Sequence, residues 1–489
     1  MRRLDGVSTF LLVREEPGAY QHTFKIGIYD PREVPGGWCY ERFHQDLAAS
    51  IAHGLPLFRC KIQRVPFDLH HPLWVDDPDF DLDYHLHRIA CPQPGDARTF
   101  CALLSQLYAW PLDHSRPLWL SWIVEGLENG RVAVVTLLHH AYTDGTGAAR
   151  LMGRYFKKQP EQIIPDDSPP WSPEPAPGKL RLVLSALRAV PIDLAHGLPK
   201  VVRGLAKMRR LREEYIKGGR ELPPTYRDAP DSPFNILLSN RRTFVFETFP
   251  FEEIRTTTRG FGVTVNDLFL ATVAGVFRQF MQERGCDVDR GPLVAMIPVE
   301  QRPPIEKDDF VGNRTSATYV SLPIHIADAV ARLSAARHAS RVMKEHFEAS
   351  KGADLLSLIG IMPVPMLRLP DWLVKRSKSK VGMNGNVILS NVKGPSERLY
   401  LGQLPLVNWI STGQILHGVG INVTVWSYAG NFNLCILADK KLLPDGWPMI
   451  DRFREAFTEY ANLSGASKFL NSLGLPPHKE SPDAAGPTD

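Results

Sequence analysis

The sequence predicts a mixed α/β protein built from two domains. Its 489 residues exceed what one hydrophobic core usually serves, and 44% of them are hydrophobic. Short apolar runs typical of strands alternate with segments of helical spacing on both sides of a proline-rich stretch. We therefore expect an N-terminal domain over 1–159, a linker over 160–240, a C-terminal domain over 241–475 and a disordered tail over 476–489.

In the first half, an apolar run over 132–138 predicts a buried strand, because it is short, rich in β-branched residues and ends at polar residues. The residues that follow are His139-His140-Ala141-Tyr142-Thr143-Asp144-Gly145. Beyond them, apolar side chains at helical spacing predict a helix: Leu151, Met152, Tyr155 and Phe156. A histidine pair is thus placed where a strand ends, a position from which an imidazole can project into a cavity.

The linker is expected to have an extended part and a helical part. Seven prolines between Pro160 and Gly178 exclude a helix or a central strand there. The next stretch, Lys179 to Arg220, carries 11 Lys/Arg against 3 Asp/Glu and has apolar residues at helical spacing. A basic amphipathic helix is typical of attachment to an anionic membrane or lipid-droplet surface. The alternative is a connector whose positive face is solvated or packs on acidic protein; no motif indicates nucleic acid.

The second half repeats the alternation of strands and helices. The segment 242–249 is predicted to be a strand, followed by a helix over 251–259 and another from Val265 to Phe280. The remaining predicted elements are strands over 293–299 and 315–322, a long helix over 328–347, and a hairpin of strands 420–428 and 431–438 around Ala429-Gly430.

Composition favours a cytoplasmic protein. No run of about 18 uncharged apolar residues predicts a transmembrane helix, and Arg2-Arg3 is not followed by the apolar segment of a secretory signal. The six cysteines lack paired spacing, which predicts reduced thiols and no metal site. The net charge is only +4.

The histidine pair suits general-base catalysis. A neutral imidazole, with a pKa near ~6.5, can remove a proton from a hydroxyl at neutral pH. Asp144 is expected to orient the imidazole or to lock the turn by pairing with an arginine. In the alternative, both histidines are structural and bond to backbone. Joint metal ligation is disfavoured because adjacent residues of an extended chain point to opposite faces. No Gly-x-Ser-x-Gly, nucleotide-binding loop or His-Glu-x-x-His is present.

The seven-residue string is similar to the His-His-x-x-x-Asp-Gly signature of the bacterial wax ester synthase/diacylglycerol acyltransferase family. Four further segments resemble motifs of that family in the same order, from about residue 4 to about residue 462. They are residues 72–85, the Pro117-Leu118-Trp119 motif, Asn266-Asp267, and Ser390-Asn391-Val392-Lys393-Gly394-Pro395. Two departures stand out. Only His22 of the family's Pro-Met-His-Val-Gly segment is kept, which bears on acyl-chain or acceptor preference, and Lys393 replaces the usual proline.

The resemblance implies two chloramphenicol-acetyltransferase-like domains with a tunnel between them, in which both substrates meet at the second histidine. Carried over to this sequence, His140 is the general base and His139 supports it. Asp144 would hold the turn, and Gly145 would permit a tight backbone course at the start of the helix.

Further site residues follow from the other motifs. Asn266 is a candidate oxyanion donor or supporting residue; alternatively, Thr264 and Asp267 form a capping box and the motif is structural. Pro117, Leu118 and Trp119 are expected to shape the wall of the site or simply to pack. The last motif places three further residues at the substrate: Asn391, Gly394 and Pro395.

The resemblance implies an acyl-CoA-dependent O-acyltransferase that uses acyl-CoA as co-substrate, needs no other cofactor, and transfers the acyl group directly. Diacylglycerol as acceptor gives triacylglycerol, and a long-chain alcohol gives wax ester. One alternative is the same fold acylating another hydroxyl or amine, as in glycolipid or natural-product assembly. Another is a non-catalytic lipid-binding or droplet-coating protein. The expected location is the cytoplasm, peripherally attached to the inner membrane or to lipid droplets.

Overall fold

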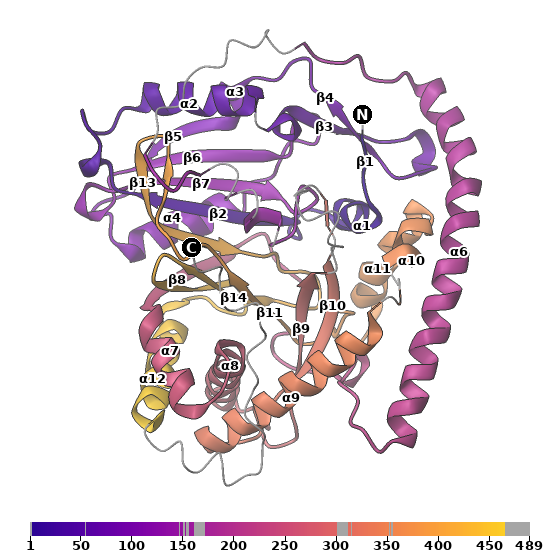
Figure 1. The fold of residues 1–489 in the computed structure, drawn as a ribbon, viewed down its shortest axis with the longest axis vertical. Helices are drawn as coiled ribbons and strands as arrows, with labels where there is room; N and C mark the ends of the chain where they lie inside the picture. Colours follow the sequence, from indigo (N-terminus) through magenta and orange to yellow (C-terminus); the bar gives the residue numbers. More distant parts are fainter. Residues whose placement is uncertain are drawn as a thin grey trace, which may run out of the picture.

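Two six-stranded sheets form the two halves of the molecule, one above the other in the view of Figure 1. The computed structural model describes residues 2–464 except 54, 146, 150–151, 153–155, 161–171, 301–311, 314, 352 and 354–355. Of the predicted helix after Gly145, Met152 and Phe156 are described and buried, whereas Leu151 and Tyr155 lie outside the described residues, as does the expected tail.

The first sheet has the strand order β12-β13-β2-β7-β6-β5. Its strands are β2 (His22–Tyr29), β5 (Leu86–Ala90), β6 (Trp119–Glu125), β7 (Val132–His139), β12 (Leu399–Leu401) and β13 (Leu404–Thr412). The strand predicted over 132–138 is therefore confirmed as β7. Strands β12 and β13 come from the second half of the chain, and β13 pairs antiparallel with β2. The predicted domain boundary at the linker placed β12 and β13 in the C-terminal domain. The pairing of β13 with β2 instead connects the two halves through one continuous sheet.

The second sheet has the order β10-β9-β11-β14-β15-β8. Its strands are β8 (Arg242–Pro250), β9 (Leu293–Glu300), β10 (Thr315–Leu322), β11 (Val387–Lys393), β14 (Ile421–Tyr428) and β15 (Asn431–Asp439). The predicted hairpin is confirmed as β14 and β15, and its two turn residues, Ala429 and Gly430, both have positive φ (45° and 84°). Such a turn matches the right-handed twist of the strands it joins.

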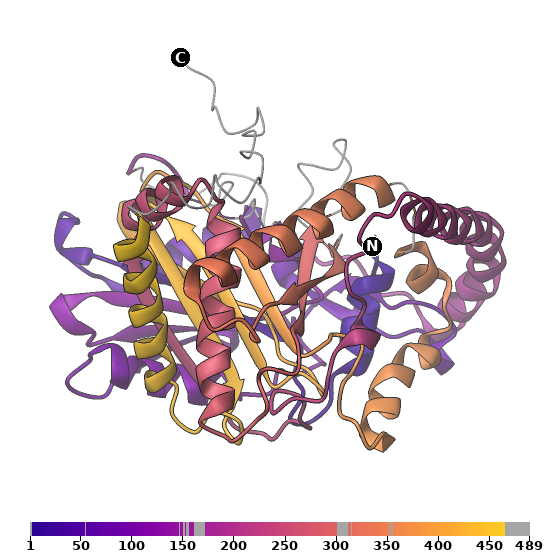
Figure 2. The same cartoon turned by 90° about the horizontal axis from the view of Figure 1, so that it is seen from below.

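Helices flank both sheets. In the first half they are α1 (Gly6–Arg14), α2 (Tyr40–His53), α3 (Leu82–His85) and α4 (Ala97–Tyr108). In the second half α7 (Phe251–Phe261), α8 (Val265–Gln282), α9 (Ala329–Ser350) and α12 (Trp447–Leu463) cover one face of the second sheet, as Figure 2 shows. Ile421, Val423 and Val425 of β14 pack against these helices, so the alternate residues of β14 face the first half.

The smaller elements join these layers. Three strands, β1 (Arg2–Arg3), β3 (Cys60–Gln63) and β4 (Leu73–Asp76), form a separate sheet. Two short helices are α10 (Leu356–Ile361) and α11 (Leu369–Arg376). The 3-10 turns are η1 (Pro31–Glu33), η2 (Pro56–Arg59), η3 (Pro66–Asp68), η4 (Glu128–Gly130), η5 (Tyr226–Asp228) and η7 (Val364–Arg368).

The predicted basic helix is one continuous helix, α6 (Lys179–Lys217), which lies along the side of the molecule next to α10 (Figures 1 and 2). Buried residues from Leu182 to Tyr215 show that it rests on the protein along its length. It also contains a window with mean hydropathy 1.2, so by length and composition alone it could cross a membrane, although no fully uncharged run is present. Of the proline-rich segment, residues 172–178 are described and have no regular secondary structure.

Candidate active site

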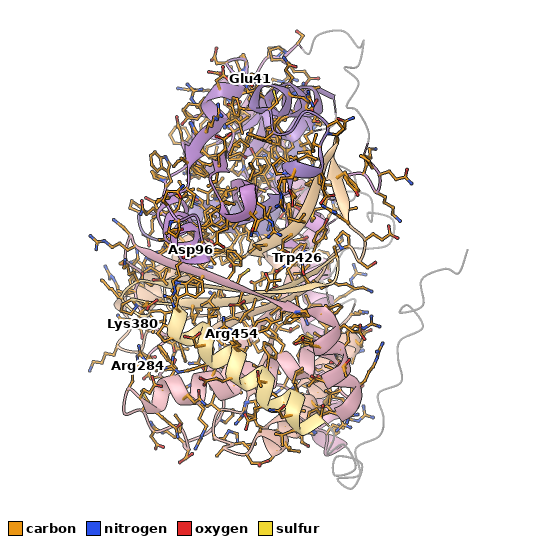
Figure 3. The ribbon with its side chains drawn as sticks, turned by 90° about the vertical axis from the view of Figure 1, so that its left-hand side faces the viewer. Glu41, Asp96, Arg284, Lys380, Trp426 and Arg454 are labelled. Atoms are coloured by element: carbon orange, nitrogen blue, oxygen red, sulfur yellow. The ribbon has the colours of Figure 1, made fainter. Side chains whose placement is uncertain are left out.

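A cavity lies between the two halves, with about 1170 Å³ of space not filled by protein atoms. Figure 3 shows one of its lining residues, Trp426, where the halves meet. The first half contributes residues of α1, β2 and the turn after β7, among them Val7, Phe10, Thr23, Lys25, His140, Thr143, Asp144 and Gly145. The second half contributes Met296 and Pro298 of β9, Ile388, Ser390 and Val392 of β11, and Asn422, Thr424 and Trp426 of β14. The cavity occupies the place of the expected tunnel.

His140 projects into this cavity from the end of β7. Its backbone N–H donates to the carbonyl of Gln21 (2.7 Å), which fixes the chain beside β2. Its ring Nδ1 lies 3.1 Å from Oδ1 of Asn313, a residue that none of the sequence motifs contained. His140 keeps part of its surface accessible, as expected for a side chain that faces a cavity.

Asn313 determines which nitrogen of His140 carries the proton. Its Nδ2 donates to the carbonyl of His140 (2.8 Å) and to the hydroxyl of Ser8 (3.0 Å), so its Oδ1 is the atom directed at the imidazole. An amide oxygen can only accept, which makes Nδ1 the protonated nitrogen and leaves Nε2 unprotonated. His140 is thus held in the tautomer that a general base needs.

The surroundings also keep His140 neutral. Burial, and after it the ammonium of Lys25, lower the pKa of His140 to about 4. An imidazolium would have to be desolvated next to another cation, which is unfavourable. At neutral pH the ring is therefore ready to accept a proton.

His139 points to the opposite face of the sheet, into a closed polar cluster. Its Nδ1 accepts a hydrogen bond from the backbone N–H of Ala141 (3.0 Å), and its Nε2 lies 2.7 Å from Oε2 of Glu15. Two more imidazoles approach Oε1 of Glu15: that of His114 at 3.2 Å and that of His22 at 3.7 Å. Burial alone would raise the pKa of Glu15, but these imidazoles outweigh it and hold the pKa well below its usual range. His139 thus braces the turn that carries His140.

Asp144 and Gly145 begin the turn of helix after β7. The Oδ1 atom of Asp144 accepts a hydrogen bond from the N–H of Gly147 (2.7 Å), the arrangement of a helix N-cap. Gly145 does not have a positive φ, and an added Cβ would lie 3.6 Å from the side chain of Val392, an ordinary contact. The tight backbone course expected at Gly145 is therefore not observed; the glycine instead leaves space in the cavity wall.

An apolar pocket adjoins the cavity on the same face of the first sheet, under α2. It encloses about 860 Å³ of space not filled by protein atoms and includes Trp119 in its wall. Leu118 is buried, and its N–H and C=O bond to the hydroxyl of Tyr142 (3.1 Å) and to the N–H of His139 (3.0 Å). Pro117 does not line either space. Of this motif, Trp119 thus shapes a wall and Leu118 supports the histidine turn.

In the motif of residues 390–395, the residues that line the cavity differ from those predicted to contact the substrate. In β11, Ser390 and Val392 line the cavity, whereas Asn391 between them is exposed on the other side of the strand. Gly394 lies against β14, where an added Cβ would overlap Ser427 and Trp426, and the carbonyl of Pro395 accepts a hydrogen bond from Ala429 (3.0 Å). These placements make Gly394 and Pro395 packing residues at the end of β11 and put Asn391 away from the cavity.

Asn266 also lies away from the cavity. It is in the first turn of α8, and its Nδ2 approaches the hydroxyl of Ser340 on α9 (3.5 Å). Thr264 and Asp267 form the capping box that was the structural alternative, with both reciprocal bonds present. The placement fits a helix start and does not fit an oxyanion donor.

The main site residues missing from the sequence analysis are Asn313, Glu15 and Lys25. For Lys25, the sequence offered one indication: it is a charged residue in an otherwise apolar stretch, directly after the segment 20–24 that departs from the family's pattern. Within the described part of the chain, no group of three or more His, Cys, Asp or Glu side chains could hold a metal ion.

Comparisons with known proteins show the family of this chain. The family model of the wax ester synthase/diacylglycerol acyltransferase catalytic domain matches residues 4–269, and that of the family's C-terminal domain matches residues 311–461. Two relatives from Mycobacterium tuberculosis, each named "Putative diacyglycerol O-acyltransferase", are 41% and 32% identical; they are aligned over 94% and 95% of this chain and 97% and 91% of their own.

Solved structures share the fold. The wax ester synthase/diacylglycerol acyltransferase from Marinobacter aquaeolei aligns with a TM-score of 0.67 at 21% identity, over 95% of this chain and 100% of its own. The first condensation domain of the calcium-dependent antibiotic synthetase aligns with a TM-score of 0.57 at 14% identity, over 95% of this chain and 97% of its own. The family models and the relatives together establish that this chain belongs to the wax ester synthase/diacylglycerol acyltransferase family.

Proposed function

We propose that the protein transfers the acyl group of a long-chain acyl-CoA directly to the hydroxyl of a lipid alcohol, with His140 as general base. The observation that carries this proposal is the hydrogen bond between Nδ1 of His140 and Oδ1 of Asn313, because it leaves Nε2 unprotonated in a cavity between the halves. No cofactor other than acyl-CoA as co-substrate is needed.

The reaction begins when Nε2 of His140 removes the hydroxyl proton as the alcohol oxygen attacks the thioester carbon. The new C–O bond forms and the C–S bond breaks, so the leaving group is the thiolate of CoA. His140 then returns its proton to that thiolate and is neutral again for the next cycle. General-base catalysis of this kind typically contributes 10²–10⁴-fold to the rate.

We propose diacylglycerol or a long-chain alcohol as the acceptor, giving triacylglycerol or wax ester. The names of the relatives support diacylglycerol, and the largely apolar lining of the cavity suits a lipid. A different hydroxyl or amine acceptor in the same site is the enzymatic alternative. A purely lipid-binding role has no use for an imidazole held in its basic tautomer.

The test is incubation of the purified protein with radiolabelled palmitoyl-CoA and either dioleoylglycerol or hexadecanol. His140→Ala is the inactive control, and the exposed His87 provides a matched histidine control, His87→Ala. Labelled triacylglycerol or wax ester that falls about 10²-fold or more in His140→Ala, but not in His87→Ala, supports the proposal. Product that survives in His140→Ala would contradict it.

We also propose that the protein binds an anionic membrane surface through α6. The helix has nine large apolar residues that are exposed to solvent, and most of them recur every three or four residues, which puts them on one face of the helix. They are Leu180, Leu184, Leu187, Ile192, Leu194, Leu198, Val202, Leu205 and Ile216. Basic residues accompany them along the helix, from Lys179 to Lys217. An apolar stripe with a basic border is the arrangement that inserts at the interface of anionic lipid.

Sedimentation with vesicles tests this attachment. We expect binding to vesicles of phosphatidylcholine and phosphatidylglycerol to exceed binding to phosphatidylcholine alone. Replacing Leu184, Leu187 and Leu198 together by serine should weaken it at least about tenfold, because each leucine buries several methylene equivalents. The exposed Trp110, outside α6, gives the matched control Trp110→Ser. Unchanged binding of the triple variant would exclude α6 as the contact.

A further inference from the structure

A row of polar side chains crosses the apolar face of the first sheet beside the active site. Ser411 of β13 lies opposite Lys25 of β2, Lys25 lies opposite Thr136 of β7, and Thr136 lies opposite Ser121 of β6. Directly paired residues share one face of a sheet, so all four side chains line up across four strands. Ser121 and Thr136 bond to each other through their hydroxyls (2.8 Å).

Lys25 is the charged member of this row and lies where the apolar pocket adjoins the cavity. It lines both the apolar pocket under α2 and the cavity that holds His140, and among the described residues it is the only charged one in the wall of the apolar pocket. Thr136, the member of the row on β7, is four residues before His140, about 13 Å along the strand at 3.3 Å per residue.

The described residues offer the ammonium of Lys25 few hydrogen-bond partners to replace the water it loses on burial. Its Nζ donates one hydrogen bond, to the hydroxyl of Ser411 (2.8 Å), and the described residues place no carboxylate within ion-pair distance of it. Burial lowers the pKa of Lys25 to about 8 while the more distant Asp144 supports the charge, so the group remains mostly protonated at neutral pH. An ammonium has three donors, and those not used by Ser411 are available in the cavity.

A neutral lipid filling the pocket would strip water from this ammonium without replacing the lost hydrogen bonds, which is unfavourable. An anionic head group would replace them with charge-assisted bonds and leave the chain among apolar side chains. Apart from this row, the wall of the pocket is mostly apolar, with residues such as Phe43, Leu47 and Ile51 of α2, which suits an alkyl chain.

We propose that this pocket binds the carboxylate of a free long-chain fatty acid, with the head group at Lys25 and Ser411 and the chain under α2. The inference concerns binding and goes beyond the proposed acyl transfer, on which it does not depend. The head group of the acid would then lie where the pocket adjoins the cavity that holds His140, because Lys25 lines both.

The experiment is calorimetric titration of the full-length protein with dodecanoate and with its neutral analogue, methyl dodecanoate. The wild type should bind dodecanoate at least about tenfold tighter, since a hydrogen bond to a charged group is worth more than a factor of ten. Lys25→Met keeps the length of the side chain without the charge and should abolish this preference. Thr136→Val, in the same row, keeps the charge and should retain it.

Equal affinity of the wild type for the two ligands would overturn the proposal, as would a preference that survives in Lys25→Met. Thermal melting of Lys25→Met confirms that the variant is folded, and the comparison of the two ligands in the wild type needs no variant. Because the titration requires no turnover, its outcome is independent of whether acyl transfer is detected with any acceptor.

Discussion

At the end of β7, the two faces of the first sheet place neighbouring histidines in opposite surroundings. His139 is fully buried and is enclosed by Glu15, His22 and His114. His140 faces the cavity, and its described side-chain hydrogen-bond partner is the uncharged amide of Asn313. The same residue type therefore has a bracing role on one face and a chemical role on the other.

The hydrogen-bond partners, rather than the residue type, set the role. Both ring nitrogens of His139 are occupied, Nδ1 by the N–H of Ala141 and Nε2 by the carboxylate of Glu15, so neither can accept a proton from a substrate. In His140, the amide of Asn313 binds Nδ1 and leaves Nε2 unprotonated, so this ring can act as a base. The strand's alternation puts each histidine in its setting, since successive side chains point to opposite faces.

Removing each histidine in turn has the largest expected effect. His140→Ala should lower kcat by about 10²–10⁴-fold with little change in folding, because the base is lost and the cavity accommodates a smaller residue. His139→Ala should mainly lower the free energy of unfolding, because it leaves the carboxylate of Glu15 buried with one partner fewer. Steady-state kinetics and thermal melting of both variants check this. Equal loss of kcat in two well-folded variants would contradict the division of roles.

A smaller effect is expected when the charge of Glu15, the partner of His139, is removed. Glu15→Gln keeps the shape of the side chain but removes its charge, and we expect a loss of about 1–3 kcal/mol in the free energy of unfolding at neutral pH. The folded-state pKa of Glu15 lies below its unfolded value, so its stabilisation is present above about pH 4.3 and is lost on further acidification. Chemical denaturation at pH 7 and pH 4 measures this. A gap between wild type and variant that widens towards pH 4 would refute this linkage.

The smallest expected effect is at Gly145. Because its φ is not positive and an added Cβ makes only an ordinary contact, Gly145→Ala should leave the free energy of unfolding within about 0.5 kcal/mol of the wild type. Gly394→Ala is the contrasting control, since there a Cβ would overlap backbone and side chain of β14. Thermal melting distinguishes them, and a large loss at Gly145 would restore the conformational role expected for this glycine.

Local patterns were sufficient for much of the fold. The apolar run of β7, the capping box at Thr264 and the turn at Ala429-Gly430 each depend on a few consecutive residues, and all three are present. The exchange of β12 and β13 into the first sheet was not predicted, because strand pairing between distant segments leaves no local pattern.

The site was predicted only where the chemistry lies within one motif. His140 lines the cavity as expected, but its partner Asn313 is 173 residues away, and Glu15 reaches His139 from α1. Asn391 illustrates a different limit. Alternation along β11 was evident, but its phase, which puts Ser390 and Val392 at the cavity and Asn391 outside, depends on where the other half lies.

The pH dependence of kcat/KM in Asn313→Asp shows whether Asn313 holds His140 as a neutral base. In the wild type, a His140 pKa of about 4 predicts a kcat/KM that does not fall between about pH 8 and about pH 6. In Asn313→Asp, a carboxylate at Nδ1 raises the pKa of His140, so kcat/KM should fall as the pH is lowered across the same range. Identical profiles for the two proteins, or a wild-type profile that already falls near pH 6.5, would contradict this role of Asn313.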